Sequence, residues 1–151
     1  MNIEIFDELA GHEVLTVAAL ADMAPSVIAI EERVPGVLGR AFELKAWYRA
    51  WRSKRQTEQT AEPKRMTVEA VDEFQAVIPW DQLDQAVFLY EQDGQPLKKG
   101  FPIRLYVPDG SSECLNVKSV VKIRFDYGSS PDEATYGFKN VVTLDELKLK
   151  K

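Results

Sequence analysis

Few side chains in this sequence could perform catalytic chemistry. The chain has one histidine, His12, and one cysteine, Cys114, so the sequence indicates neither a histidine-based hydrolytic site nor a Cys/His metal site. His12 lies between Gly11 and Glu13 without a partner at catalytic spacing, and we expect it in a turn. Cys114 follows Glu113, and a neighbouring carboxylate disfavours the thiolate nucleophile. We therefore predict an ordinary loop cysteine.

Four carboxylates in the middle of the chain could instead act in acid–base chemistry or bind Mg²⁺. They do not recur at a defined spacing, and acidic residues outside such a pattern usually lie on solvated turns. We therefore predict no catalytic residue and no metal ligand among them: Asp72, Glu73, Asp81 and Asp84.

A segment rich in aromatic and basic residues suggests a third kind of chemistry, the binding of nucleic acid. Trp47, Tyr48 and Trp51 alternate with arginines and lysines, which together could stack bases and hold phosphates. The same spacing is typical of a helix with a buried aromatic side and a solvated basic side, which is the interpretation we favour. Residues 40–65 carry eight Lys or Arg against three Glu, yet the whole chain has a net charge of −5. Nucleic acid is therefore not the expected partner.

The bulk properties are those of a soluble globular protein. With 151 residues, of which 45% are hydrophobic and 28% charged, the chain fits a single domain over 1–151. No apolar run approaches the ~20 residues that span a bilayer, so no membrane association is expected. The first residues are acidic and lack the basic start and apolar core of a signal peptide. We therefore expect a cytoplasmic protein.

The hydrophobic pattern predicts both helices and strands. Thr16 is a suitable N-cap for a helix over Val17–Met23, and a longer helix is expected from about Ala41 to Arg55. Pro79 precedes a short helix over Trp80–Gln85. These elements, with the strands, indicate an α+β domain with a mixed β-sheet. The strands are predicted at Ile3–Phe6, Val27–Glu31 (central in the sheet), Met66–Val71, Ala86–Glu91 and near Asn140–Thr143, before a fraying helix at Leu144–Lys151.

The stretch from Asp93 to Ile123 is the most informative part of the sequence. It begins with the turn dipeptide Asp93–Gly94, followed by a strand bounded by Pro102 and Pro108, a loop, and a second strand from about Asn116. Alternation predicts one face of that second strand to carry Val117, Ser119, Val121, Ile123 and Phe125, with Lys118, Val120, Lys122 and Arg124 on the other.

This ordered run resembles the C-terminal part of the molybdopterin-binding catalytic domain of sulfite oxidase-like oxidoreductases. The resemblance implies the mixed-sheet α+β fold of that domain and a pterin cofactor that carries molybdenum. It covers roughly residues 3–125 and leaves 126–151 as a C-terminal extension. The segments that resemble the family, in the family's order, are Val14–Leu20, Gly39–Trp47, Val68–Phe74 and Gly100–Ile123.

The resemblance also implies where a cofactor would lie. In the family a cysteine thiolate binds the metal just after the strand that matches Val27–Ile30, where this chain has Ile30-Glu31-Glu32. The chain thus resembles a member without the metal ligand. The family's loop between its last two core strands offers backbone N–H groups and a lysine to the pterin and its phosphate. The matching positions, our candidate cofactor-binding residues, are Ser111, Ser112, Asn116 and Lys118. Their alternative interpretation is a polar hairpin loop beside a solvated lysine.

We therefore expect a non-catalytic binding or interaction protein, with an unknown protein or a small anionic ligand such as a pterin as its partner. No cofactor is predicted, and molybdopterin is implied by the resemblance alone. One alternative is a molybdopterin-dependent oxidoreductase with an atypical metal site in which Cys114 is a substitute ligand. The other is a nucleic-acid or protein adaptor that uses the basic segment 40–65.

Overall fold

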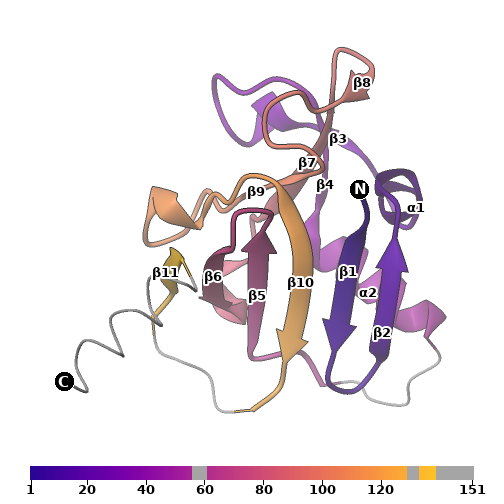
Figure 1. Ribbon diagram of the computed structural model, residues 1–151, viewed down its shortest axis with the longest axis vertical. Coiled ribbons are helices and arrows are strands. Elements are labelled where there is room, and N and C mark those ends of the chain that lie inside the picture. The colour runs from indigo at the N-terminus through magenta and orange to yellow at the C-terminus, as the bar shows by residue number, and fades with distance from the viewer. Residues whose placement is uncertain (56–60, 129–132, 139–151) are drawn as a thin grey trace.

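The computed structural model describes residues 1–55, 61–128 and 133–138, and its strands form two β-sheets (Figure 1). In sheet A, β1 pairs parallel with β10 and the other neighbours pair antiparallel. The sheet is therefore mixed, as the sequence predicts. From edge to edge its strands are β11 (Thr135–Phe138), β6 (Phe74–Pro79), β5 (Arg65–Ala70), β10 (Val120–Asp126), β1 (Ile3–Asp7) and β2 (Gly11–Leu15).

Sheet B is smaller and antiparallel in every pairing. Its longest strand is β7, which pairs with three others, and Figure 1 shows this sheet above and behind sheet A. Its strands are β3 (Ile28–Ala29), β4 (Arg40–Glu43), β7 (Val87–Gln92), β8 (Gln95–Pro96) and β9 (Arg104–Tyr106).

Helices complete an α+β fold, which confirms the predicted class. The helix α1 (Val17–Asp22) begins as expected, because the Thr16 hydroxyl accepts a hydrogen bond from the Ala19 N–H at 3.1 Å. The helix α2 (Leu44–Lys54) covers the rear face of sheet A in Figure 1. Short 3₁₀ turns form η1 (Ile30–Glu32), η2 (Trp80–Gln82) and η3 (Glu113–Leu115).

The main hydrophobic core lies between α2 and the two sheets. The ring centroids of Tyr48 on α2 and Phe125 on β10 are 4.3 Å apart. Phe42 and Phe88 bring sheet B into the same cluster, with ring centroids 5.9 Å apart. A second cluster on the other side of sheet B contains Ile30, Ala41, Val87, Leu89, Leu97 and Tyr106. Because one face of sheet A is buried in this way, its other face is left for solvent.

The predicted start of the long helix is wrong. Arg40–Glu43 form strand β4, in which Phe42 lies opposite Phe88 of β7. The helix begins only at Leu44, whose N–H donates to the carbonyl of Ala86. The helical spacing of the aromatic residues extends back to Phe42 by coincidence, and a partner strand distant in sequence overrides it.

The predicted central strand over Val27–Glu31 is also wrong. Only Ile28–Ala29 pair as a strand, at the edge of sheet B, and Ile30 begins η1. The apolar character of the segment has a different cause, because Ile30 is fully buried in the second cluster.

His12 lies in a strand and not in the predicted turn. It belongs to β2, opposite Phe6 of β1, and the turn precedes it at residues 8–10. The strand was missed because β2 is short and polar, with only Leu15 buried. Its pairing depends on β1, which the sequence does predict.

The predicted faces of the second strand change partway along it. Val120, Ile123 and Phe125 are all buried, although strict alternation would place Val120 on the face opposite to Ile123 and Phe125. The register shifts between Val120 and Lys122, and Ser119 before it has a φ of +56°. This β-bulge moves Val120 to the core side and leaves Lys122 and Arg124 on the open side.

Two strands that the sequence did not predict extend sheet A on one side. β6 follows a tight turn at Asp72–Glu73, and β11 pairs with β6 from the expected C-terminal extension. The strand and helix predicted over 140–151 lie outside the described residues.

Candidate functional site

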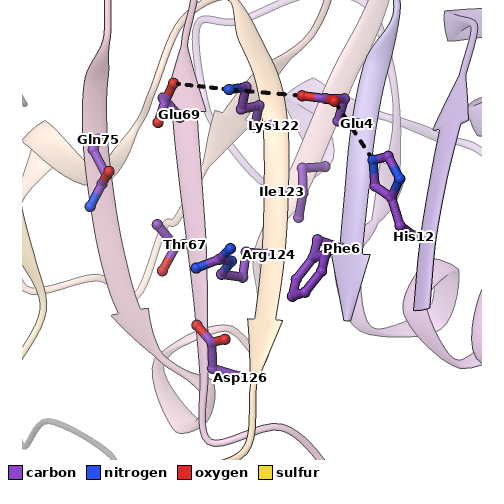
Figure 2. A pocket seen from close by; sticks show the side chains of 10 residues that line it. All are labelled: Glu4, Phe6, His12, Thr67, Glu69, Gln75, Lys122, Ile123, Arg124 and Asp126. Atoms are coloured by element: carbon purple, nitrogen blue, oxygen red, sulfur yellow. Dashed lines mark ion pairs between the residues drawn. The ribbon is translucent and has the colours of Figure 1, made fainter. Parts of the chain in front are cut away.

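The open face of sheet A holds a shallow pocket of about 390 Å³ (Figure 2). It is lined across five neighbouring strands, mostly by residues two apart that share the open face. The lining residues are Glu4, Phe6, His12, Thr67, Glu69, Gln75, Lys122, Ile123, Arg124 and Asp126.

A row of ion pairs crosses the upper part of this pocket in Figure 2. Lys122 lies 3.8 Å from a carboxylate oxygen of Glu69 on one side and 3.8 Å from one of Glu4 on the other. Glu4 is also 3.6 Å from Nε2 of His12. Each charge in the row therefore faces an opposite or potentially opposite charge.

The lower part of the pocket contains Arg124 and Asp126. The guanidinium of Arg124 lies 4.7 Å from the ring centre of Phe6, which is cation–π distance. Burial raises the pKa of the Asp126 carboxyl above its usual value. The guanidinium of Arg65, 3.6 Å away, acts in the opposite direction without cancelling this shift. The lining contains no nucleophile beside a base, and its charges largely compensate one another. This face is suited to solvent or to a polar surface.

The loop predicted to bind a cofactor lies elsewhere, around η3. Ser112 caps η3, since its hydroxyl accepts a hydrogen bond from the Cys114 N–H at 3.1 Å. The side-chain oxygen of Asn116 accepts from the Val107 N–H at 2.7 Å. These two polar groups hold the loop in shape. Ser111 and Lys118 are exposed and remain the accessible members of the predicted set.

Backbone hydrogen bonds place Lys118 beside a second basic segment. The Ser119 N–H donates to the Gly100 carbonyl at 3.3 Å, and the Leu105 N–H donates to the Val117 carbonyl at 2.8 Å. The segments 98–104 and 117–120 are therefore neighbours. We call the cations they carry the basic ridge: Lys98, Lys99, Arg104 and Lys118.

The cations of the basic ridge differ from several other basic groups of the described chain in their lack of carboxylate partners. Within residues 1–55, 61–128 and 133–138, no ion pair joins a ridge cation to an acidic side chain. Arg33, Arg40, Lys45 and Arg49, by contrast, each pair with an Asp or Glu. An approaching anion would therefore meet uncompensated positive charge at the ridge.

Arg104 is the most restrained cation of the ridge. Its guanidinium lies 5.1 Å from the ring centre of Tyr106. Gly100, with a φ of +85°, lies against its stem, and a Cβ on Gly100 would lie 2.3 Å from Cδ of Arg104. Only glycine leaves this space, so Gly100 sets the path of the Arg104 side chain.

The other chemical candidates are dispersed. Cys114 is exposed in η3, which contacts β6 of sheet A, whereas Ile30–Glu32 follow β3 of sheet B. Figure 1 shows η3, the orange turn beyond β9, apart from β3, so Cys114 and Glu31 do not line one site. No cluster of His, Cys, Asp and Glu suited to a metal occurs in the described part of the chain.

One acidic candidate, Asp84, and the three aromatic candidates have structural roles. Lys45 pairs with Asp84 and lowers its pKa. Trp47, Tyr48 and Trp51 are at most 1% exposed, so their rings are not available to stack on bases.

Comparison with known proteins adds no assignment. No family model, no curated protein and no solved structure matches this chain. Among the described residues, no helix is both long and apolar enough to cross a membrane.

Three of the four ridge cations were missed as candidate site residues. A signal was available, because residues 94–108 contain Lys98, Lys99 and Arg104 and no acidic residue. Their meeting with Lys118 depends on backbone hydrogen bonds that local patterns do not reveal.

Proposed function

We propose that this protein is a cytoplasmic, non-catalytic binding protein whose basic ridge takes a small anionic ligand that bears phosphate, with a pterin phosphate as one such ligand. The observation that carries the proposal is a group of four cations that form no ion pair with a carboxylate among the described residues, on a chain with net charge −5. The resemblance of residues 100–123 to a pterin-binding domain supports a ligand site in the same region. In that resemblance Lys118 matches the lysine that the family offers to the pterin phosphate.

The chemistry of the ridge favours phosphate over a single carboxylate. Lysine ammonium groups are mobile point charges that suit a multiply charged oxyanion. Arg104 adds a planar donor that is restrained by Tyr106 and Gly100. Exposed Phe101, next to Gly100 in the chain, offers an apolar surface to the organic part of a ligand.

Binding of inorganic pyrophosphate and of neopterin monophosphate tests the proposal by calorimetry at low ionic strength. The double variant Lys99→Gln/Lys118→Gln should bind both probes roughly tenfold more weakly, which corresponds to about 1.4 kcal/mol. The charge-matched control Lys54→Gln/Lys122→Gln removes two lysines outside the ridge and should bind as the parent does. Equal weakening in both variants would assign the effect to net charge and contradict a site at the ridge.

The non-catalytic part of the proposal has a separate test. Metal content and pterin fluorescence after oxidation should be measured on the protein as purified. Stoichiometric molybdenum would contradict a non-catalytic protein and favour the alternative, an oxidoreductase with an atypical metal site.

A further inference from the structure

The strand β11 forms an unusual edge of sheet A. It pairs with β6, and in the described part of the chain nothing pairs with its other side. Its residues are Thr135, Tyr136, Gly137 and Phe138, with no charge and no proline. Proteins commonly protect such edges with charged residues, prolines or bulges, because unpaired backbone groups recruit further strands. The opposite edge, β2, carries His12 and Glu13.

Two aromatic side chains of β11 lie on the core side of the sheet, beside this edge. Tyr136 and Phe138 are 50% and 41% exposed. Their rings meet that of Phe74 on β6, with centroids 6.4 Å and 5.1 Å away, and Phe74 itself packs against the main core. We call this surface the aromatic shelf: Phe74, Tyr136 and Phe138.

The surroundings of the aromatic shelf are acidic. Asp72 and Glu73 directly precede Phe74, Glu133 precedes β11, and Glu113 belongs to η3, which contacts β6. The segments that carry these side chains, residues 72–79, 113–115 and 133–138, contain no lysine or arginine. A basic residue, Lys118, lies next to Ser119, whose carbonyl accepts a hydrogen bond from the Val71 N–H just before Asp72. The charge next to the shelf is therefore negative and lacks a basic neighbour within those segments.

We propose that β11 and the aromatic shelf are the docking site for an extended basic segment of another protein, which adds to sheet A as a further strand. Backbone groups of the segment would pair with the open side of β11, as in other complexes formed by strand addition. Its Arg or Lys side chains would stack on exposed rings of the shelf and meet the surrounding carboxylates.

A second copy of this chain fits the same surface less well. It would bring the same acidic corner and a net charge of −5 to an already acidic surface. Like charges placed opposite each other oppose association, whereas a basic segment is complementary.

Peptide binding to the full chain tests this inference. The probe is an end-capped octapeptide of alternating threonine and arginine, and the first control peptide has glutamate in place of arginine. The second control is the arginine peptide N-methylated at alternate residues, which cannot pair as a strand. We expect binding of the arginine peptide alone, with NMR shifts of the Tyr136, Gly137 and Phe138 amides.

A pair of protein variants locates the binding site. The variant Tyr136→Ala/Phe138→Ala should bind the arginine peptide roughly tenfold more weakly, since it removes the two exposed rings on which the cations would stack. The control Phe6→Ala/Val14→Ala removes two exposed apolar side chains from β1 and β2 and should bind within twofold of the parent. Near-UV circular dichroism of both variants checks that the tryptophan-rich core is retained.

Three results of the peptide experiments would overturn the inference. These are undetectable binding of the arginine peptide, equal binding of its N-methylated form, and unchanged affinity in Tyr136→Ala/Phe138→Ala. A dimer of the parent that this variant abolishes would also overturn it and assign the surface to a second copy. None of these results bears on the basic ridge, so the proposed function is tested separately.

Discussion

The carboxylate of Asp7 joins three segments that are far apart in the chain. It is 1% exposed and accepts hydrogen bonds from the hydroxyls of Tyr48 at 2.6 Å and Tyr127 at 2.8 Å. Its other oxygen accepts from the N–H groups of Leu9 and Ala10 at 2.8 and 2.9 Å. The end of β1, helix α2 and the end of β10 are therefore fixed by one side chain.

Replacement of this carboxylate gives the first prediction. Asp7→Asn should lower the free energy of unfolding by roughly 1.5–3 kcal/mol, because the amide nitrogen cannot accept the two tyrosine hydrogen bonds. Urea denaturation measures the change. Asp81→Asn, at an exposed position on η2, is the control and should stay within about 0.5 kcal/mol of the parent. A similar loss in both variants would contradict a special role for Asp7.

The pH dependence of stability tests the same cluster. Burial, and then the hydrogen bond to Asp7, raise the pKa of the Tyr48 hydroxyl well above its usual value of 10.0. Above pH 10 the unfolded chain therefore loses a proton that folded Tyr48 keeps, so stability present below pH 10 is lost as the pH rises.

The expected size of this loss is about 1.4 kcal/mol per pH unit from Tyr48 above pH 10. Urea denaturation between pH 8 and 11, followed by far-UV circular dichroism, measures the slope. Tyr48→Phe should be less stable at neutral pH but should lose stability less steeply above pH 10. An unchanged slope in Tyr48→Phe would show that the hydroxyl ionises normally in the folded protein.

At the scale of elements, the loop between η1 and β4 depends on Gly39. This residue has a φ of +137°, and an added Cβ would lie 2.5 Å from the Glu91 carbonyl oxygen and 2.7 Å from Cδ1 of Leu89. Gly36 in the same loop has a φ of +85° and nothing within 4 Å of such an atom. A side chain at either position would therefore strain the backbone, and only at Gly39 would its Cβ also collide with neighbouring atoms.

Substitution of these two glycines separates the two effects. Gly36→Ala should cost roughly 1–2 kcal/mol of unfolding free energy, the usual penalty for a left-handed alanine. Gly39→Ala should cost more by a further 1–3 kcal/mol, because strand β7 must move away. Thermal or urea denaturation of both variants measures the difference. Equal losses would mean that β7 accommodates the methyl group freely.

Local patterns predicted the elements whose partners are near in the sequence. The Thr16 cap and the buried aromatic side of α2 follow from spacing alone. The bulge before Lys122 and strand β11 do not, since each is defined by pairing with a distant strand. The same reason explains the candidate site. Lys118 could be selected from its own segment, whereas its neighbours on the basic ridge join it through hydrogen bonds between residues 100–105 and 117–120.

At the scale of the whole molecule, the two sheets share one core. Phe42 and Phe88 of sheet B belong to the same cluster as Trp47, Tyr48 and Phe125, which pack on sheet A. Neither sheet can therefore separate without exposing aromatic surface of the other. A shared core of this kind favours a single cooperative transition.

Chemical denaturation with two signals tests this coupling. Tryptophan fluorescence reports mainly on the side of the core formed by sheet A and α2, where Trp47, Trp51 and Trp80 lie. Far-UV circular dichroism reports on the strands of both sheets. We expect the two urea curves to coincide in the parent. In Phe88→Leu, a change in sheet B that should cost about 1 kcal/mol, both curves should shift by the same amount. A fluorescence midpoint that stays in place while the dichroism curve moves would show that sheet B unfolds on its own. The three ridge cations carried by β9 and the segment before it, Lys98, Lys99 and Arg104, would then belong to a separate unit.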